Sequence, residues 1–157
     1  MKSNCSIFHR RSGIALLAAL TLSLSAVASH AAAPAESLYR RLGGYDSIAA
    51  FVDTAFPRVA AHPQLSHLFR GHSQSSQLRQ RQLIVDALCA VTGGPCIYTG
   101  RDMKPVHVGL GITAAQWETF MGIISATATE RDFGAADKAE FLELFTTHFK
   151  PDVVEKP

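Results

Sequence analysis

Residues 92–113 read TGGPCIYTGRDMKPVHVGLGIT, and this stretch decides the fold. Its five glycines and two prolines are too many for a continuous helix or strand. We therefore predict a long loop with at most one helical turn, over Asp102–Val108. Long loops without secondary structure of their own are uncommon in compact domains and usually have a function. This loop is the first place to look for a site.

The sequence before this loop has the apolar spacing of amphipathic helices. Asp46 can cap a helix whose apolar residues recur at three- and four-residue steps as far as Val59, and Pro57 predicts a bend in it. A short helical turn is expected over residues 65–69. A further helix over residues 73–90 starts with serines that can cap it.

The sequence after the loop has the same character. Thr113 can cap a strongly amphipathic helix, and a last helix is expected from about Ala135 to Phe149. Residues 150–157 are polar and are expected to form a tail. No segment alternates polar and apolar residues at every second position, as a half-buried strand would. The predicted fold class is all-α.

The first 31 residues have the layout of a secretory signal peptide. Three basic residues precede an uncharged apolar run at Gly13–Ala28, and the small residues Ser29 and Ala31 suit cleavage. The run is shorter than the ~20 residues of a spanning helix, which favours a cleaved leader over a membrane anchor. We expect export, to the periplasm or the medium. The expected division is residues 1–31 signal peptide, 32–36 linker, 37–153 folded domain and 154–157 tail.

Removal of this leader changes the sign of the net charge. The chain has 15 basic and 13 acidic residues, and three basic ones lie in the leader, which leaves 12 against 13. A net charge of about −1 without a basic cluster excludes a typical nucleic-acid-binding surface. The 47% of hydrophobic and 18% of charged residues are typical of a soluble globular domain. We expect a monomer or weak dimer that has no contact with the membrane after cleavage.

Common catalytic motifs are absent from the sequence. Five histidines follow the leader: His62, His67, His72, His107 and His148. No two of them have the H-x-x-x-H spacing of a zinc-protease helix, and neither G-x-S-x-G nor a Walker loop occurs. Cys89 and Cys96 can pair in an oxidising compartment or remain two buried thiols. Their spacing is neither C-x-x-C nor C-x-x-C-H.

His107 is a candidate for metal chemistry because of its surroundings. It lies on the expected helical turn between Val106 and Val108. A lone histidine among apolar residues is most often a core residue that is bonded to the backbone. The alternative is an axial haem ligand, which needs one neutral ring nitrogen in an apolar slot. Walls for such a slot can come from Phe56, Phe69, Tyr98, Met103, Ile112, Trp117 and Met121.

Three motifs resemble those of group I truncated haemoglobins. They are LYRRLGG at residues 38–44, Phe69 followed by Gly71, and the series GGP, YTGR-x-MK, H and GIT within residues 93–113. The series is the most specific of the three, and the resemblance covers residues 37–153. It implies a two-over-two helical sandwich around one haem b, with His107 as the proximal iron ligand. Phe69 matches the phenylalanine that packs against the haem plane.

On the distal side the sequence departs from this family. Phe56 stands where a tyrosine usually donates a hydrogen bond to O₂, and its ring has no donor. An ungapped comparison directs Leu78 and Gln82 toward the ligand. The segment after Phe69 is longer than in the family, so another polar residue of this helix can be the donor instead. The alternatives are Gln77, Gln80 and Arg81. His72 can be a sixth iron ligand, or a surface or capping residue.

The resemblance also implies contacts around the haem. Arg101 and Lys104 can pair with the propionates or remain solvated loop charges. Other contacts are expected from Phe69, Tyr98, Met103, Ile112, Trp117 and Met121.

The function that this resemblance implies is reversible binding of a diatomic gas, O₂ or NO, at a haem iron. An oxygen binder or carrier is the default for the family. A nitric oxide dioxygenase is the first alternative, and it would require a reductase as partner. A haem-based gas sensor or haem-storage module is the second.

Overall fold

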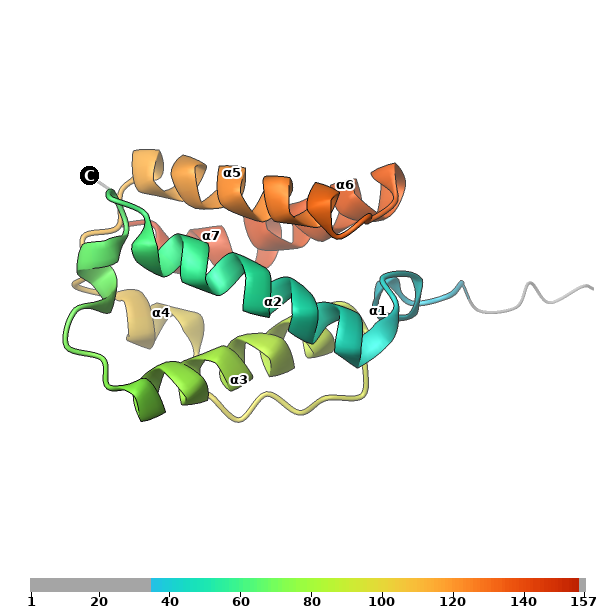
Figure 1. The fold of residues 1–157 in the computed structure, drawn as a ribbon, viewed down its shortest axis with the longest axis horizontal. Helices are drawn as coiled ribbons and strands as arrows, with labels where there is room; N and C mark the ends of the chain where they lie inside the picture. The colour runs from blue at the N-terminus through green and yellow to red at the C-terminus, as the bar shows by residue number, and fades with distance from the viewer. Residues whose placement is uncertain (1–34, 156–157) are drawn as a thin grey trace, which may run out of the picture. The chain divides into compact units, whose positions relative to one another are not determined.

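The computed structural model describes residues 35–155 (Figure 1). The signal peptide expected over residues 1–31, most of the linker and the last two residues of the tail lie outside the described residues. The elements in chain order are α1 (Leu38–Arg41), α2 (Gly44–Ala61), η1 (Ser66–Phe69), α3 (Gln74–Val91), α4 (Met103–His107), α5 (Ala114–Glu130), α6 (Ala135–Leu144), η2 (Phe145–Phe149) and α7 (Lys150–Val153). Here η1 is a 3₁₀ helix and η2 a π-helical segment.

Two antiparallel helix pairs form the described domain. α2 runs antiparallel to α3, α5 runs antiparallel to α6, and α2 packs against both α3 and α5 (Figure 1). No strand occurs within residues 35–155. The predicted all-α class and two-over-two arrangement are confirmed. In the same range no helix has the length and apolar character needed to cross a membrane.

The helix starts follow from local capping. Thr113 and Gln116 form a capping box at the start of α5, and the Ser73 hydroxyl accepts a hydrogen bond from Ser76 N at the start of α3. The cap predicted at Asp46 is wrong, because α2 begins two residues earlier, after Gly43. Gly43 has a left-handed φ of +93°, which a side chain would strain. α2 continues through Pro57 to Ala61.

The C-terminal segment differs from the prediction. Residues 150–157 were expected to be a polar tail, but the helix that ends at Leu144 continues through η2 into α7. Val153 reaches the cavity described below, and the carboxylate of Glu155 binds the loop after α4. The prediction failed because the segment is polar in composition, yet two side chains anchor it. Val153 makes an apolar contact at the cavity, and the Glu155 carboxylate binds backbone N–H groups.

Aromatic residues join the helix pairs in the core. Phe51 on α2 and Phe141 on α6 are each 1% exposed, and their rings meet edge to face at 5.1 Å between centroids. Phe141 makes a similar contact with Phe145, at 5.2 Å. Burying a phenylalanine side chain contributes roughly 1.5–3 kcal/mol. This cluster fixes α6 against α2 on one side of the cavity.

Candidate functional site

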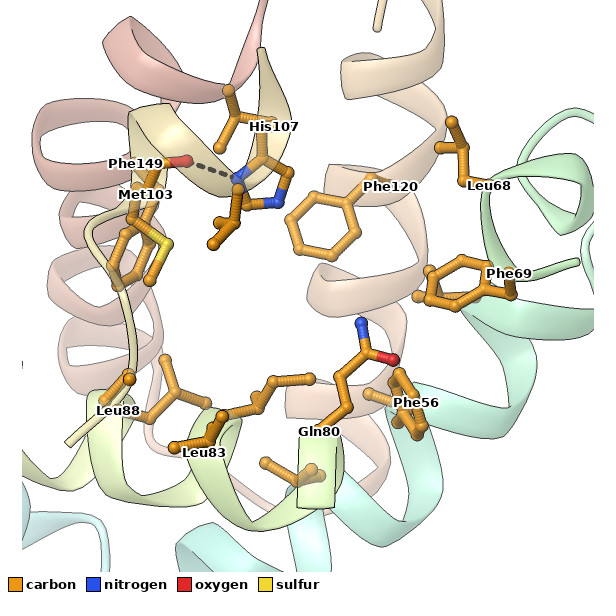
Figure 2. Close-up of a pocket in the computed structure, with 18 of the residues that line it drawn as sticks. Phe56, Leu68, Phe69, Gln80, Leu83, Leu88, Met103, His107, Phe120 and Phe149 are labelled. Carbon is orange, nitrogen blue, oxygen red and sulfur yellow. Dashed lines mark hydrogen bonds between the residues drawn. The ribbon is translucent and has the colours of Figure 1, made fainter. Parts of the chain in front are cut away.

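A cavity of about 650 Å³ lies between α2, α3, α4 and α5 (Figure 2). Most of its lining is apolar. The larger apolar side chains include Phe51, Phe56, Leu65, Phe69, Leu83, Leu88, Met103, Trp117, Phe120, Phe145 and Phe149. A cavity of this size with few polar groups is typical of a small-molecule or cofactor site.

His107 enters this cavity from the last residue of α4. Its Nδ1 lies 2.7 Å from the Met103 carbonyl oxygen, and Figure 2 shows the other ring nitrogen directed into the open space. A carbonyl can only accept, so Nδ1 carries the proton and Nε2 keeps a free lone pair. The imidazole is therefore fixed in the tautomer that can bind a metal through Nε2.

The loop before α4 is tied to the end of α3. Cys89 and Cys96 form a disulfide, so the pairing expected as one of two alternatives is present. Gly94 lies so close to Cys89 and Tyr39 that a β-carbon there would come within 2.5–2.7 Å of their atoms. Only glycine allows this approach, and it brings the start of the loop against α3.

Tyr98 holds the second half of this loop. Its hydroxyl donates to the Arg101 carbonyl at 2.7 Å, and its ring lies over Gly100, where a β-carbon would clash. Burial, helped by the charge of Asp102, raises the pKa of the Tyr98 phenol, so the hydroxyl keeps its proton. The resulting turn brings Arg101 to the cavity lining, next to Tyr98.

Of the polar residues that line the cavity from α3, Gln80 is the half-buried one. The residues of α3 that line the cavity recur at three- and four-residue steps: Ser76, Arg79, Gln80, Leu83, Ile84, Ala87 and Leu88. In Figure 2 the nitrogen of the Gln80 amide points into the open space and its oxygen toward Phe56. Gln80 Oε1 is buried and has no hydrogen-bond partner in residues 35–155. The amide nitrogen, which can donate, is thus the polar atom that Gln80 offers to a ligand in the cavity.

The predicted directions of Leu78 and Gln82 are wrong. Leu78 is 63% exposed and lines a separate shallow groove of about 240 Å³ between α2 and α3. Gln82 donates instead to the Tyr45 hydroxyl and to Asp86. Each of the two lies two positions from Gln80, about 200° around the helix from it.

The other two candidate donors also lie elsewhere. Arg81 forms a bidentate ion pair with Asp53 on α2, with both N–O distances at 2.8 Å. Gln77 donates to the His72 carbonyl at 3.3 Å. Of the alternatives on α3, only Gln80 lines the cavity.

The aromatic residues expected on the distal side do meet at the cavity. Phe56 and Phe69 contact each other edge to face at 5.7 Å between centroids. The exposed His72 lines the cavity rim and packs its ring against Phe69 at 6.2 Å. No hydrogen bond to the His72 ring occurs among the described residues, so its role as a sixth ligand stays a prediction.

The remaining predicted contacts divide into two groups. The cavity is lined by Tyr98, Arg101, Met103, Ile112 and Trp117. Met121 and Lys104 were expected there, but they are not among its lining residues. Met121 lies about 40° around α5 from Trp117, away from the arc that holds Phe120 and Ile124. It packs against the core instead. Lys104 is exposed.

The lining also includes residues that were not predicted for the site, and three of them are notable. Phe120 follows Trp117 at a three-residue step, and Phe149 reaches the cavity from η2. The three-residue step from Trp117 could have predicted that Phe120 lines the cavity. The position of Phe149 could not be predicted in this way, because it depends on how η2 winds. Arg79 is an exposed cation at the lining, one residue before Gln80.

Comparison with known proteins agrees with this geometry. Residues 37–153 match the family model described as bacterial-like globin. The chain is 34% identical over 106 residues to a group 1 truncated hemoglobin of Mycolicibacterium paratuberculosis, covering 68% of this chain and 76% of that protein. It is 26% identical over 95 residues to a group 1 truncated hemoglobin of Tetrahymena pyriformis, covering 60% of this chain and 76% of that protein.

A solved structure has the same fold. The crystal structure of a mutant of the Tetrahymena pyriformis truncated hemoglobin, in its Fe(III) form, aligns with a TM-score of 0.69 and 25% identity, covering 77% of this chain and all of that one. The chain therefore belongs to the bacterial-like globin family, as a haem-binding globin of the group 1 truncated hemoglobin kind.

Proposed function

We propose that this protein reversibly binds O₂ at one haem b whose iron is held by His107. The observation that carries the proposal is the pairing of His107 and Gln80 across one apolar cavity (Figure 2). One supplies an imidazole nitrogen directed into the open space, and the other supplies an amide nitrogen directed into the same space. An iron site with a single protein ligand and a hydrogen-bond donor opposite suits a diatomic gas.

The residues fit haem b in three respects. The walls are apolar and aromatic, as a flat porphyrin requires. The Met103 carbonyl fixes the imidazole tautomer that leaves Nε2 for iron. Arg79 and Arg101 supply exposed cations at the lining, and both can pair with propionates. No C-x-x-C-H motif is present for covalent attachment, which favours non-covalent haem b.

When bound, the haem supplies an iron with one open coordination position, and the protein controls access and polarity there. With haem bound, the Gln80 amide nitrogen would be the group that donates a hydrogen bond to a gas in the pocket. Phe56 and Phe69 fill the space beside it and exclude water without adding a donor. Trp117 and Phe120 cover the wall formed by α5. The hydrogen bond to a bound gas would therefore depend on Gln80.

Gas binding to the purified ferrous protein tests this proposal. The expected result is a Soret band that shifts with O₂ and returns when O₂ is removed, with full recovery over repeated cycles. Rapid mixing of the oxygenated protein with NO, followed by nitrate measurement, tests the dioxygenase alternative. Irreversible oxidation by O₂ alone would contradict reversible binding. Stoichiometric nitrate, with catalytic turnover once a reductase is added, would favour the enzyme instead.

We also propose that the protein is exported. The layout of residues 1–31 supports this, and the Cys89–Cys96 disulfide suits an oxidising compartment. Mass spectrometry of protein from the native host should find a mature N-terminus near Ala32. An intact Met1 in the cytoplasmic fraction would contradict export.

A further inference from the structure

We propose that Glu155 is a positioning residue for the proximal ligand: its carboxylate fixes the turn after His107 and, through that turn, the orientation of the imidazole. The inference rests on the proposed function, because it treats His107 as the iron ligand. Glu155 lies in the stretch that was expected to be a polar tail.

One carboxylate oxygen of Glu155 accepts two backbone hydrogen bonds. Its Oε1 lies 2.7 Å from Gly109 N and 3.0 Å from Gly111 N. The Glu155 N–H donates to the Ile112 carbonyl at 3.0 Å. The C-terminal segment is therefore joined at three points to the connection between α4 and α5.

The two glycines give this connection a shape that suits an anion. Gly109 has a φ of +81° and Gly111 a φ of +64°, and no atom lies within 4 Å of a β-carbon built at either. Their glycine identity is thus required by the backbone conformation rather than by a lack of space. In this conformation both N–H groups converge on one point, and a carboxylate is a strong acceptor there.

The turn is connected to His107 through the last carbonyls of α4. Val108 N donates to the Lys104 carbonyl at 2.9 Å, and Leu110 N donates to the His107 carbonyl at 3.1 Å. α4 has only five residues, and an isolated helix of that length is unstable. The bond between His107 Nδ1 and the Met103 carbonyl exists only while α4 stays wound. Glu155 thus stabilises the ligand by holding the C-terminal end of its helix.

The carboxylate is itself held in place. α7 packs against α4, and Val153 of α7 contributes to the cavity lining. Glu155 follows this anchored segment by two residues. The packing of α7 against α4 and of Val153 at the cavity therefore places the Glu155 side chain beside Gly109 and Gly111.

Three variants of the mature chain test the role. Glu155→Ala removes the acceptor, and Glu155→Gln keeps an acceptor oxygen without the charge. Asp152→Ala is the matched control, because it removes an exposed acid of α7 that accepts no hydrogen bond among the described residues. Haem loss to excess apomyoglobin is measured for each. Glu155→Ala should lose haem at least about threefold faster, because two backbone N–H groups lose their acceptor. Glu155→Gln should recover most of this difference, and Asp152→Ala should match the parent.

Resonance Raman of the ferrous, gas-free protein supplies a readout that general destabilisation would not move. Glu155→Ala should shift or broaden the iron–histidine stretching band, and hydrogen exchange at the Gly109 and Gly111 amides should accelerate. Faster amide exchange with an unchanged band and unchanged haem loss would overturn the positioning role and leave Glu155 as a tether only. A parent chain that takes up no haem would overturn the proposed function itself, which separates the two failures.

Discussion

His107 reaches the cavity from a helix of five residues, whereas Gln80 reaches it from a helix of 18. The short helix is held by hydrogen bonds between side chains and backbone groups: the His107 ring bonds to the Met103 carbonyl, and the N–H groups of the following glycines donate to the Glu155 carboxylate. The long helix is regular, and packing alone decides which of its side chains face inward. The proximal side thus depends on individual polar contacts and the distal side on helix register. Substitutions on the two sides should therefore have different effects.

The largest effect is expected from His107→Ala. Removal of the imidazole leaves the cavity without an iron ligand, so the variant should lose most of its haem during purification, and added imidazole should partly restore a Soret band. His148→Ala is the control, because His148 is exposed and does not line the cavity. An unchanged haem spectrum in His107→Ala would show that another residue holds the iron.

The disulfide joins the two sides, and its loss should be the next largest effect. Cys89–Cys96 closes a short loop between the end of α3 and the chain that leads to α4. Replacing both cysteines by alanine should lower the free energy of unfolding by about 2–3 kcal/mol, because the unfolded chain regains loop entropy. Urea unfolding with and without a dithiol measures this. The dithiol should not change the free energy of unfolding of the double variant. If it lowers this free energy equally in both proteins, its effect does not come from the Cys89–Cys96 bond.

Gln80→Leu tests the distal register directly. Loss of the α3 amide at the cavity should speed O₂ release about three- to tenfold, as expected for one neutral hydrogen bond, while CO release changes less. Gln82→Leu makes the same substitution two residues away, on the face of α3 that bonds Tyr45 and Asp86. Stopped-flow release rates should separate the two variants. If only Gln82→Leu releases O₂ faster, then Gln82 faces the cavity, as the ungapped comparison predicted and as the structure contradicts.

Phe56→Tyr should have a smaller effect in the opposite direction. The added hydroxyl provides a second donor beside Gln80, so O₂ release should slow. The hydroxyl can also donate to Gln80 Oε1, which has no partner among the described residues, and this competition keeps the gain below about threefold. The O₂ release rate of Phe56→Tyr is compared with that of the Phe56→Tyr/Gln80→Leu double variant. An unchanged rate in both would show that position 56 lies out of reach of the gas.

The smallest effect is expected at the ion pair between α2 and α3. The Arg81 guanidinium lowers the pKa of the Asp53 carboxyl. The pair therefore stabilises the fold above the unfolded pKa of about 3.9, and this contribution is lost as the pH falls through the lower folded value. The Asp53 side chain is 58% exposed, so Asp53→Asn should cost less than about 1 kcal/mol at neutral pH. Acid titration of the unfolding midpoint should show the two proteins converging at low pH.

The proximal half could be predicted from the sequence because its signals are local. The glycines and prolines of residues 92–113 predict the loop, and the turn expected over Asp102–Val108 is present as α4 with Asp102 and Val108 as its caps. The caps of α3 and α5 were predicted for the same reason, because Ser73 and Thr113 bond to backbone groups three residues away.

The distal half could not be predicted to the residue, since a helix presents different side chains when its register changes. The sequence determined that α3 carries several glutamines, and packing against α2 decided that Gln80 faces inward and Gln82 outward. The sequence likewise determined Glu155, Gly109 and Gly111. Glu155 lies more than 40 residues after both glycines along the chain. Only the tertiary structure brought them together, because the winding of η2 and α7 returns the end of the chain to α4. Local patterns fix turns, caps and the ligand type, whereas the choice of donor depends on contacts between distant segments.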